Sequence, residues 1–433
     1  MSTDGNRSSG FMSRRDFARF AALGGSAAML SSQAAPGRQK EPLPPAPSAP
    51  DEKYWERVKQ QFALSPGLIV MNAANLCPSS LPAWESLLQS TRDIDRDPSF
   101  DNRAKMTAGK ESTRKILAAY LRVTPEEIII TRNTSEANNL VSNGIELKEG
   151  DEVVVFSDNH PSNLAAWIAK AKRYGFTVRT VQQVNPHPGA EYYIEAFTRE
   201  MTPQTRVLAL THLTNTVGDL LPVQELCRVA RNRGVLSLVD GAQSLGLMDV
   251  DLGEMKPDFY SGSAHKWPCG PKECGVLYVN RAAHDRIWPT IYSAYTGATG
   301  LSKTFEGFGQ RDEPAIIAFG EALRFLDGIG RGAIEKRGRE LAQSLMEGLR
   351  KLGGVQVWSH PDPQRSVAVV SFRPGTLDVR KLVAALYQKD RIACATRGGS
   401  DRPGLRLSPH LYNTHAEVDR TLAAVRRYLA AGV

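Results

Sequence analysis

Lys266 lies in an unusual setting for a charged side chain. It ends the segment Ser261-Gly-Ser-Ala-His-Lys266, which follows a strand pattern and precedes the turn at Gly270-Pro271. An amine held in such a place can form a Schiff base with an aldehyde or transfer a proton. A solvated surface lysine explains this segment equally well when it is taken alone, so the interpretation depends on the residues around it.

An acid ends the apolar run from Val235 to Asp240, and Gln243 follows three residues later. In open parallel sheets, ligands bind beyond the carboxyl ends of the strands. A carboxylate there can raise the pKa of a pyridine nitrogen and keep it protonated, which pyridoxal 5′-phosphate (PLP) requires to act as an electron sink. Gln243 could donate a hydrogen bond to the phenolate oxygen of that ring. Taken alone, Asp240 could also be a helix N-cap.

Two further segments suit the same ligand. Thr134 and Ser135 begin a predicted helix directly after a predicted strand, where hydroxyl and free N–H groups can hold a phosphate. His160 follows the strand pattern that ends at Phe156, and its ring could stack on a pyridine. Each feature has an ordinary structural explanation by itself, but together they predict a PLP site.

The order of these residues resembles the class V aminotransferase family of fold-type I PLP enzymes, which includes isopenicillin N epimerase and cysteine desulfurases. The resemblance covers roughly residues 65–430. It rests on the following positions: Thr134-Ser135, His160, Asn215, Asp240-x-x-Gln243 and Ser263-x-His265-Lys266. It implies an enzyme that forms a homodimer with its active sites at the interface.

The resemblance also implies a role for each cofactor residue. Lys266 would carry PLP as a Schiff base and move protons at the substrate Cα. Asp240 would pair with the pyridine nitrogen, His160 would stack on the ring, and Asn215 would lie beside Gln243 near the phenolate oxygen. The phosphate would be held by Thr134, Ser135, Ser263 and His265.

On the substrate side, the resemblance points to Arg406, within Gly404-Leu-Arg-Leu-Ser-Pro. Its planar guanidinium would bind the substrate carboxylate in a bidentate manner. Asn72 would lie near the substrate, and Cys77 occupies a place often held by glycine.

Two departures from the desulfurase pattern bear on the reaction. The loop Arg397-Gly-Gly-Ser-Asp-Arg-Pro-Gly404 has no cysteine to accept sulfur, and Cys394 lies in an apolar strand pattern. Gly309-Gln-Arg-Asp312 resembles the Gly-Thr-Arg-Asp motif of epimerase-like members, with Gln310 in place of the threonine that would reach the partner subunit's phosphate. We therefore expect an epimerase-like enzyme or an aminotransferase that acts at the Cα of an amino acid. The alternatives are a C–S lyase or desulfurase-type enzyme without a protein persulfide, and a degenerate PLP-fold binding protein.

The elements that must position these residues alternate between strand and helix from about residue 101 to 240. This alternation predicts an α/β fold with a mostly parallel sheet, of the seven-stranded type that the resemblance implies. We expect a large PLP-binding domain over residues 51–312, which includes the N-terminal segment. Two long helices would then lead into a small α+β domain over residues 313–433.

The N-terminal region predicts export. Arg14 and Arg15 precede a weakly apolar run from Phe20 to Leu30, which is the layout of a twin-arginine signal peptide over residues 1–35. The run is too short for a stable membrane span. A Pro-rich linker over residues 36–50 would follow. We therefore expect a periplasmic or extracellular enzyme that uses the twin-arginine export machinery.

Composition excludes other classes of function. The 433 residues carry a formal charge of +8, but the Lys and Arg residues are scattered and form no stripe that would bind nucleic acid. The charge instead favours anionic small molecules. Five cysteines make no disulfide framework, although a disulfide between Cys269 and Cys274 stays open. No His or further Cys near these two completes a zinc-ligand pattern, so the sequence predicts no metal site.

Overall fold

The computed structural model describes residues 43–397 and 401–433. The predicted signal peptide, residues 1–35, and the first part of the predicted linker lie outside the described residues, so export stays a prediction. Leu43 and Ala46, at the end of the Pro-rich segment, pack against the hydrophobic core. In the described ranges no helix is both long enough and apolar enough to cross a bilayer.

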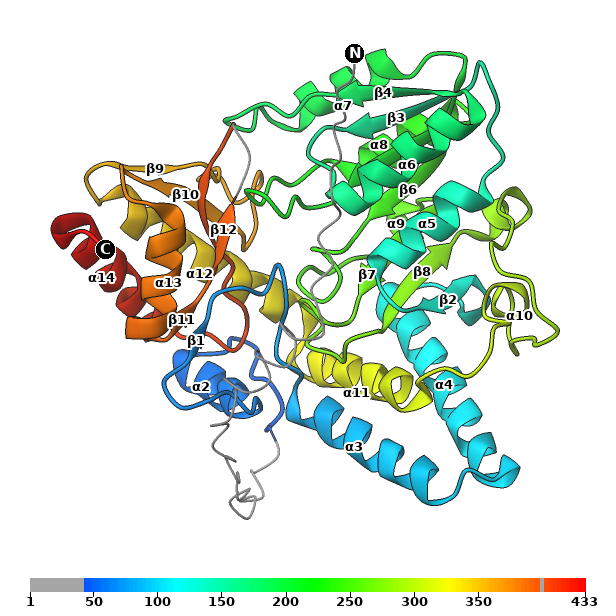
Figure 1. Ribbon diagram of the computed structural model, residues 1–433, viewed down its shortest axis with the longest axis horizontal. Coiled ribbons are helices and arrows are strands. Elements are labelled where there is room, and N and C mark those ends of the chain that lie inside the picture. The colour runs from blue at the N-terminus through cyan, green and yellow to red at the C-terminus, as the bar shows by residue number, and fades with distance from the viewer. Residues whose placement is uncertain (1–42, 398–400) are drawn as a thin grey trace, which may run out of the picture. The chain divides into compact units, whose positions relative to one another are not determined.

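A seven-stranded sheet forms the centre of the large part of the chain (Figure 1). Strand β8 runs antiparallel to both of its neighbours, and the other pairs are parallel, so the predicted mostly parallel sheet is confirmed. The spatial order is β2 (Ile128–Thr131), β8 (Gly275–Val279), β7 (Phe259–Ser263), β6 (Leu236–Asp240), β5 (Thr205–Thr211), β3 (Glu152–Phe156) and β4 (Thr177–Val181).

Helices cover both faces of this sheet because successive strand residues point to opposite sides. Val154 belongs to one buried apolar cluster, and its neighbours Val153 and Val155 belong to another. The first cluster includes residues of α4 (Phe100–Leu121), α7 (Ala190–Glu200) and α8 (Val223–Asn232). The second includes residues of α5 (Thr134–Gly144) and α6 (Pro161–Tyr174). The short helices α9 (Leu252–Met255) and α10 (Ser302–Phe305) and the 3₁₀ turns Pro125–Glu127 and Arg281–Arg286 complete this part.

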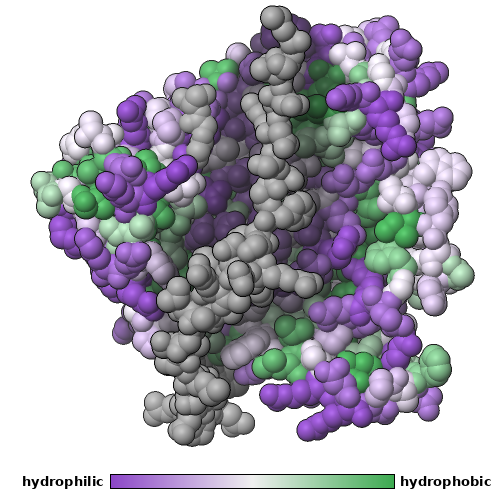
Figure 2. Space-filling model, viewed as in Figure 1, coloured by the Kyte–Doolittle hydropathy of each residue, from purple (hydrophilic) through white to green (hydrophobic). Residues whose placement is uncertain are grey.

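The C-terminal part has a separate apolar cluster around a four-stranded antiparallel sheet. Its strands, in spatial order, are β12 (Ala395–Arg397), β13 (Gly404–Leu407), β10 (Val370–Pro374) and β9 (Val355–Val357). The helices of this part and of the connection to it are α11 (Glu313–Ile329), α12 (Arg331–Arg350), α13 (Val379–Asp390) and α14 (His415–Ala431). The face shown in Figure 2 is mainly hydrophilic, with apolar residues in small scattered groups.

The N-terminal segment contributes elements to both parts of the fold. These elements are α2 (Glu52–Gln60), α3 (Leu81–Arg96) and β1 (Ile69–Val70). Strand β1 pairs in parallel with β11 (Ile392–Ala393), and α3 packs against α11. The segment between β1 and α3 is thereby held beside the loop that carries Lys266, where the backbone N–H of Cys77 donates to the carbonyl of His265 at 2.8 Å.

Most predicted strands and helices from residue 101 onward are confirmed within one or two residues at each end. The apolar run at residues 367–372 predicts one strand, but this is wrong at its start, because Ala368 has a φ of 41° and the extended strand begins only at Val370. The run at residues 392–395 likewise predicts one strand, which in the structure divides between β11 and β12 of different sheets.

Candidate active site

Asp240 lies at the carboxyl end of β6 and is 2% exposed. Its Oδ2 accepts hydrogen bonds from Nδ2 of Asn138 at 2.8 Å and of Asn163 at 3.3 Å. Its Oδ1 accepts one from the backbone N–H of Ala242 at 3.0 Å. These donors are neutral, so they orient the carboxylate and leave its negative charge available to a cationic group of a ligand.

Lys266 follows β7 in a partly buried turn. Burial lowers the pKa of its amine from 10.5 to about 8, while the carboxylate of Asp240 raises it and the guanidinium of Arg406 lowers it further. An amine with a pKa near 8 has a substantial unprotonated fraction close to neutral pH. It can therefore attack an aldehyde or accept a proton.

The N-terminus of α5 and the end of β7 form an anion cradle. The hydroxyl of Ser263 accepts a hydrogen bond from the backbone N–H of Thr134 at 2.8 Å and lies 2.7 Å from the Thr134 hydroxyl. Ser135 donates to the hydroxyl of Ser162 at 3.1 Å, at the start of the neighbouring helix α6. Helix N-termini with nearby hydroxyls suit a phosphate, and the predicted phosphate residues Thr134, Ser135 and Ser263 do lie together.

Two histidines flank this cradle, and both are neutral. His160 caps α6, and burial together with the charge of Lys266 lowers its pKa. Its Nδ1 lies 2.8 Å from the hydroxyl of Ser162. Burial and the charge of Lys266 also lower the pKa of His265, to about 4. The stacking role of the first and the phosphate contact of the second stay predictions.

Gln243 is already engaged at both ends of its amide. Its Nε2 donates to the carbonyl of Ala74 at 3.0 Å, and its Oε1 accepts from Nε1 of Trp267 at 2.8 Å. An amide nitrogen has two hydrogens, so one N–H is left for the predicted contact with a phenolate oxygen. The two hydrogen bonds also tie the segment after β1 to the loop of Lys266.

Arg406 lies on β13, in the C-terminal part, and points back toward the large sheet. Its Nη1 donates to the backbone carbonyl of Asn215 at 2.8 Å, and its Nη2 lies 3.4 Å from Oδ1 of Asn72. Burial and the neighbouring Arg397 lower the pKa of its guanidinium to about 10. Its Nε is buried without a hydrogen-bond partner among the described residues. The structure thus brings together the predicted residues Arg406, Asn72 and Asn215, with donor capacity left for an anion.

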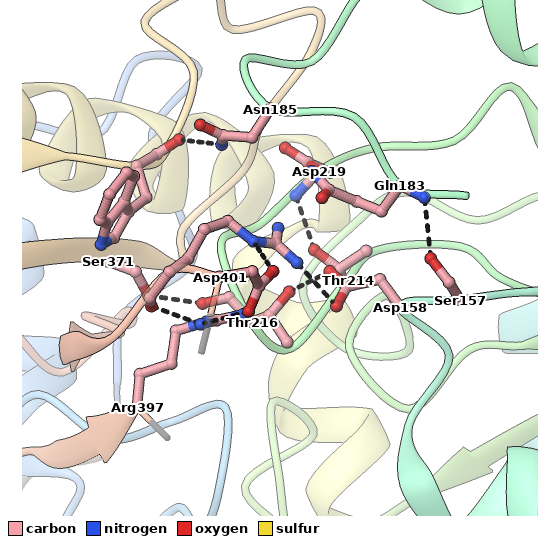
Figure 3. Close-up of polar contacts among 12 residues, drawn as sticks. Ser157, Asp158, Gln183, Asn185, Thr214, Thr216, Asp219, Ser371, Arg397 and Asp401 are labelled. Atoms are coloured by element: carbon pink, nitrogen blue, oxygen red, sulfur yellow. Dashed lines mark hydrogen bonds and ion pairs between the residues drawn. The ribbon is translucent and has the colours of Figure 1, made fainter. Parts of the chain in front are cut away.

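A network of charged and polar side chains lies beside the pocket that Asn215 and Arg406 line (Figure 3). Arg402, which is 3% exposed, donates to Oδ1 of Asp158 at 3.0 Å and to Oδ2 of Asp401 at 2.7 Å. The hydroxyl of Thr216 donates to the other oxygen of Asp158. A pocket here is lined by residues that include Asp158, Asn215, Thr216, Arg397 and Arg406. The ion pair between Arg402 and Asp158 therefore joins the β12–β13 loop to the loop that follows β3.

Cys394, Cys269, Cys274 and Gln310 bear on three expectations from the sequence. Burial raises the pKa of the Cys394 thiol to about 12, which disfavours a thiolate there. Cys269 and Cys274 are free thiols, so a disulfide between them is not formed. The side chain of Gln310 is exposed and accepts a hydrogen bond from Arg103 of α4 at 2.8 Å.

Sequence reasoning missed Asn138 and Asn163, the two amides that orient Asp240. Asn138 lies four residues after Thr134 on α5, and Asn163 lies three residues after His160 on α6. Residues at these spacings share a helix face. An asparagine one helical turn after a predicted ligand residue could therefore have been recognised in the sequence as a second polar residue of the same site. The ion pair between Asp158 and Arg402 could not be recognised in this way, because the two residues lie in loops 244 residues apart in the sequence.

The donor set fits PLP in each of its parts. The lysine amine can bind its aldehyde, the unneutralised carboxylate of Asp240 can pair with its pyridinium, and the cradle at the start of α5 can bind its phosphate. The position of Arg406 leaves a place for a substrate carboxylate beside it.

Comparison with known proteins points the same way. Residues 91–421 match the profile of a family described as Aminotransferase class-V. The isopenicillin N epimerase of Amycolatopsis lactamdurans is 31% identical over 391 residues, which cover 86% of this chain and 98% of that protein. A probable cysteine desulfurase of Methanothermobacter thermautotrophicus strain Delta H is 27% identical over 393 residues, which cover 84% and 95% of the two chains.

Solved structures of C-DES share the fold. One, in which glycine is covalently linked to the PLP cofactor, has a TM-score of 0.79 at 25% identity and covers 85% of this chain and 98% of its own. Another is described as the cystine C–S lyase with its product cysteine persulfide. It has a TM-score of 0.77 at 25% identity and covers 83% and 98% of the two chains.

Proposed function

Since the chain belongs to the class V aminotransferase family and its cofactor is PLP, we propose that it acts at the Cα of an amino acid in an epimerase-like reaction. The observation that carries this proposal is the convergence of Lys266, Asp240 and Arg406. The first two are an amine and a carboxylate that interact electrostatically, and the guanidinium of Arg406 acts on the same amine. These are a proton carrier, a partner for the cofactor ring and a carboxylate receptor within one site.

Each of these residues has a physical task. PLP, when bound, supplies an electron sink for a carbanion at the substrate Cα. The free amine of Lys266, with its pKa lowered to about 8, can remove the Cα proton from its own face, and inversion requires that a proton then reaches the opposite face of the Cα. Asn138 and Asn163 keep Asp240 directed at one point, and Arg406 holds the substrate carboxylate so that the Cα–H bond keeps one orientation.

The experiment follows the Cα hydrogen and its configuration. Single L- and D-amino acids are incubated with purified enzyme and PLP in deuterated water, and mass spectrometry with chiral chromatography measures exchange and inversion. We expect exchange together with formation of the opposite configuration for at least one substrate class. Lys266→Ala should abolish both, while Lys336→Ala, at an exposed lysine of α12, should abolish neither. Exchange without inversion, accompanied by keto acid only, would identify an aminotransferase instead.

A C–S lyase is the second candidate, because the C-DES structures resemble this chain over most of its length. A persulfide carried by Cys394 is disfavoured, since burial raises the pKa of that thiol to about 12. Elimination would release hydrogen sulfide, pyruvate and ammonia from cysteine, or cysteine persulfide, pyruvate and ammonia from cystine. Detection of these products without inversion would replace the epimerase proposal by this one.

We further propose that the enzyme is an exported homodimer. The segment after the second 3₁₀ turn exposes four large apolar side chains, which would need cover: Trp288, Ile291, Tyr292 and Tyr295. Light scattering on the purified chain tests the dimer, and a monomer at micromolar concentration would exclude it.

Cell fractionation tests export. It compares the wild type with a variant in which Arg14 and Arg15 are both changed to Lys, and we expect this variant to lose export.

A further inference from the structure

Three buried side chains from distant parts of the chain meet behind the loop of Lys266. They are Cys77, before α3, Cys269, three residues after the lysine, and His410, four residues after Arg406. Their exposed fractions are 1%, 0% and 0%. The two sulfur atoms and a ring nitrogen of the histidine all lie within 4.8 Å of one another. Two thiols and an imidazole in this arrangement are the ligand types that soft and borderline metal ions prefer.

The imidazole of His410 is prepared to donate a lone pair. Its Nε2 lies 2.7 Å from the backbone carbonyl of Trp267. A carbonyl only accepts hydrogen bonds, so Nε2 carries the proton and Nδ1 carries the lone pair. Nδ1 is buried and has no hydrogen-bond partner among the described residues. A histidine that donates one N–H to a carbonyl and offers its other nitrogen is the usual arrangement of a metal ligand.

The two thiols are also held in place. Cys77 Sγ lies 3.8 Å from the carbonyl of Ala73 and 3.5 Å from the hydroxyl of Tyr412. Both sulfur atoms are buried, and Lys266 is a neighbouring amine whose charge interacts with Cys77. A bound divalent cation compensates two negative sulfurs in this buried place, which a single lysine amine does not.

We propose that Cys77, Cys269 and His410 form a buried structural site for one Zn²⁺ ion. Binding forms two Zn–S bonds and one Zn–N bond, and the two thiol protons leave to solvent, so no oxidant or reductant is needed. Two thiolates and one divalent ion sum to zero charge, which suits a position without water. Ligand atoms around tetrahedral zinc lie about 3.6–3.8 Å apart, so sulfurs within 4.8 Å need to move by about 1 Å at most.

The ion would hold the catalytic loop to its two neighbours. The N–H of Cys77 donates to the carbonyl of His265 at 2.8 Å, and the N–H of Cys269 donates to the carbonyl of Lys266 at 2.9 Å. The hydroxyl of Tyr412 can donate to the Cys77 sulfur or complete the coordination. A bond through zinc would therefore fasten the segment before α3, the Lys266 loop and the segment after β13 at one point.

Zinc explains the orphaned nitrogen of His410, and a disulfide does not. Oxidation of Cys77 and Cys269 to a disulfide would use both sulfurs but leave Nδ1 buried without a partner. A monovalent copper ion would leave the site with a net negative charge. These two alternatives become outcomes of the experiment.

The test measures metal in the full, untagged protein loaded with PLP. The protein is treated with a chelator under reducing conditions, dialysed against micromolar zinc chloride or cuprous ion, and analysed for metal per chain. We expect one equivalent of zinc in the wild type and none in Cys77→Ala, Cys269→Ala or His410→Phe. Cys227→Ala removes an equally buried thiol of α8 outside the cluster, so this control should keep its zinc.

A second measurement does not depend on whether the variants fold. Wild-type protein refilled with cobalt should show a thiolate-to-cobalt charge-transfer band and the intense visible bands of tetrahedral cobalt, and zinc should displace both. Chelation should lower the melting temperature of the wild type and of Cys227→Ala alike. The proposal is overturned if the wild type binds no zinc, if cobalt lacks the thiolate band, or if copper alone binds. A Cys77–Cys269 disulfide, recovered by non-reducing peptide mapping of freshly purified protein, would also overturn it.

Discussion

The cofactor side and the substrate side of the site are built differently. On the cofactor side, Asp240 and Ser263 end strands of the large sheet and are already hydrogen-bonded to groups of α5. On the substrate side, Arg406 is close enough to Arg397 to have its pKa lowered, and its Nε lacks a partner among the described residues. The first side is organised before a ligand arrives, whereas on the second a buried N–H of the Arg406 guanidinium is left to donate to a substrate anion. The difference teaches that cofactor binding depends on local sheet geometry and substrate binding on how the two parts of the chain meet.

Removal of the lysine should have the largest effect on turnover. It disrupts the cofactor side of the site and leaves the substrate side unchanged. Lys266→Ala loses both the Schiff base and the proton carrier, so we expect kcat to fall by about 10⁴-fold or more. The absorption band of the lysine-bound cofactor should vanish, while phosphate contacts keep some PLP bound. Retention of turnover in this variant would show that the chemistry is elsewhere.

The pH dependence of apoprotein stability should follow the same amine. Its pKa is lowered from 10.5 to about 8 in the folded chain, so between these values the unfolded chain binds more protons than the folded one. The free energy of unfolding should therefore rise with pH through this window, by up to about 3 kcal/mol. Lys266→Met should be relatively more stable below pH 8 and should lack this rise. Denaturant titrations of both apoproteins at several pH values measure the difference, and parallel curves would contradict the pKa shift.

On the substrate side, Arg406→Lys keeps the charge but loses the planar fork. We expect KM for the amino acid to rise and kcat/KM to fall roughly 30-fold, because a bidentate contact becomes a single one. This factor corresponds to a loss of about 2 kcal/mol in transition-state stabilisation. The absorption spectrum and the affinity for PLP should stay as in the wild type. A change in PLP affinity would mean that the two sides are not separate.

The smallest effect should come from the amides behind Asp240. Asn138→Ala removes the 2.8 Å hydrogen bond to Asp240, and Asn163→Ala removes the 3.3 Å hydrogen bond. We expect each variant to lose about 1 kcal/mol of transition-state stabilisation, with the larger loss in Asn138→Ala. The loss should appear in kcat and in the cofactor spectrum, with KM unchanged. Equal losses in both variants, or a loss in KM, would show that these residues are only structural.

Prediction from sequence succeeded where a residue's position follows from its own element. Asp240, Thr134 and Ser263 lie at strand or helix ends, and the alternation of apolar residues located those ends correctly. It failed where the backbone departs from its local preference, as at Ala368, whose positive φ delays β10. It also missed Asn138 and Asn163, because a polar residue on a helix face looks the same whether that face meets solvent or a carboxylate.

The sequence by itself determined the α/β architecture, the order of strands and helices along the chain, and the residue types that a PLP enzyme of this family needs. These follow from patterns of apolar and polar residues within windows of about 10–20 residues, because the periodicity of buried residues differs between helices and strands. Only the tertiary structure decided which distant loops meet: Arg402 with Asp158, and Cys77 with Cys269 and His410. Contacts across hundreds of residues depend on how the two parts pack, and no short-range pattern encodes that.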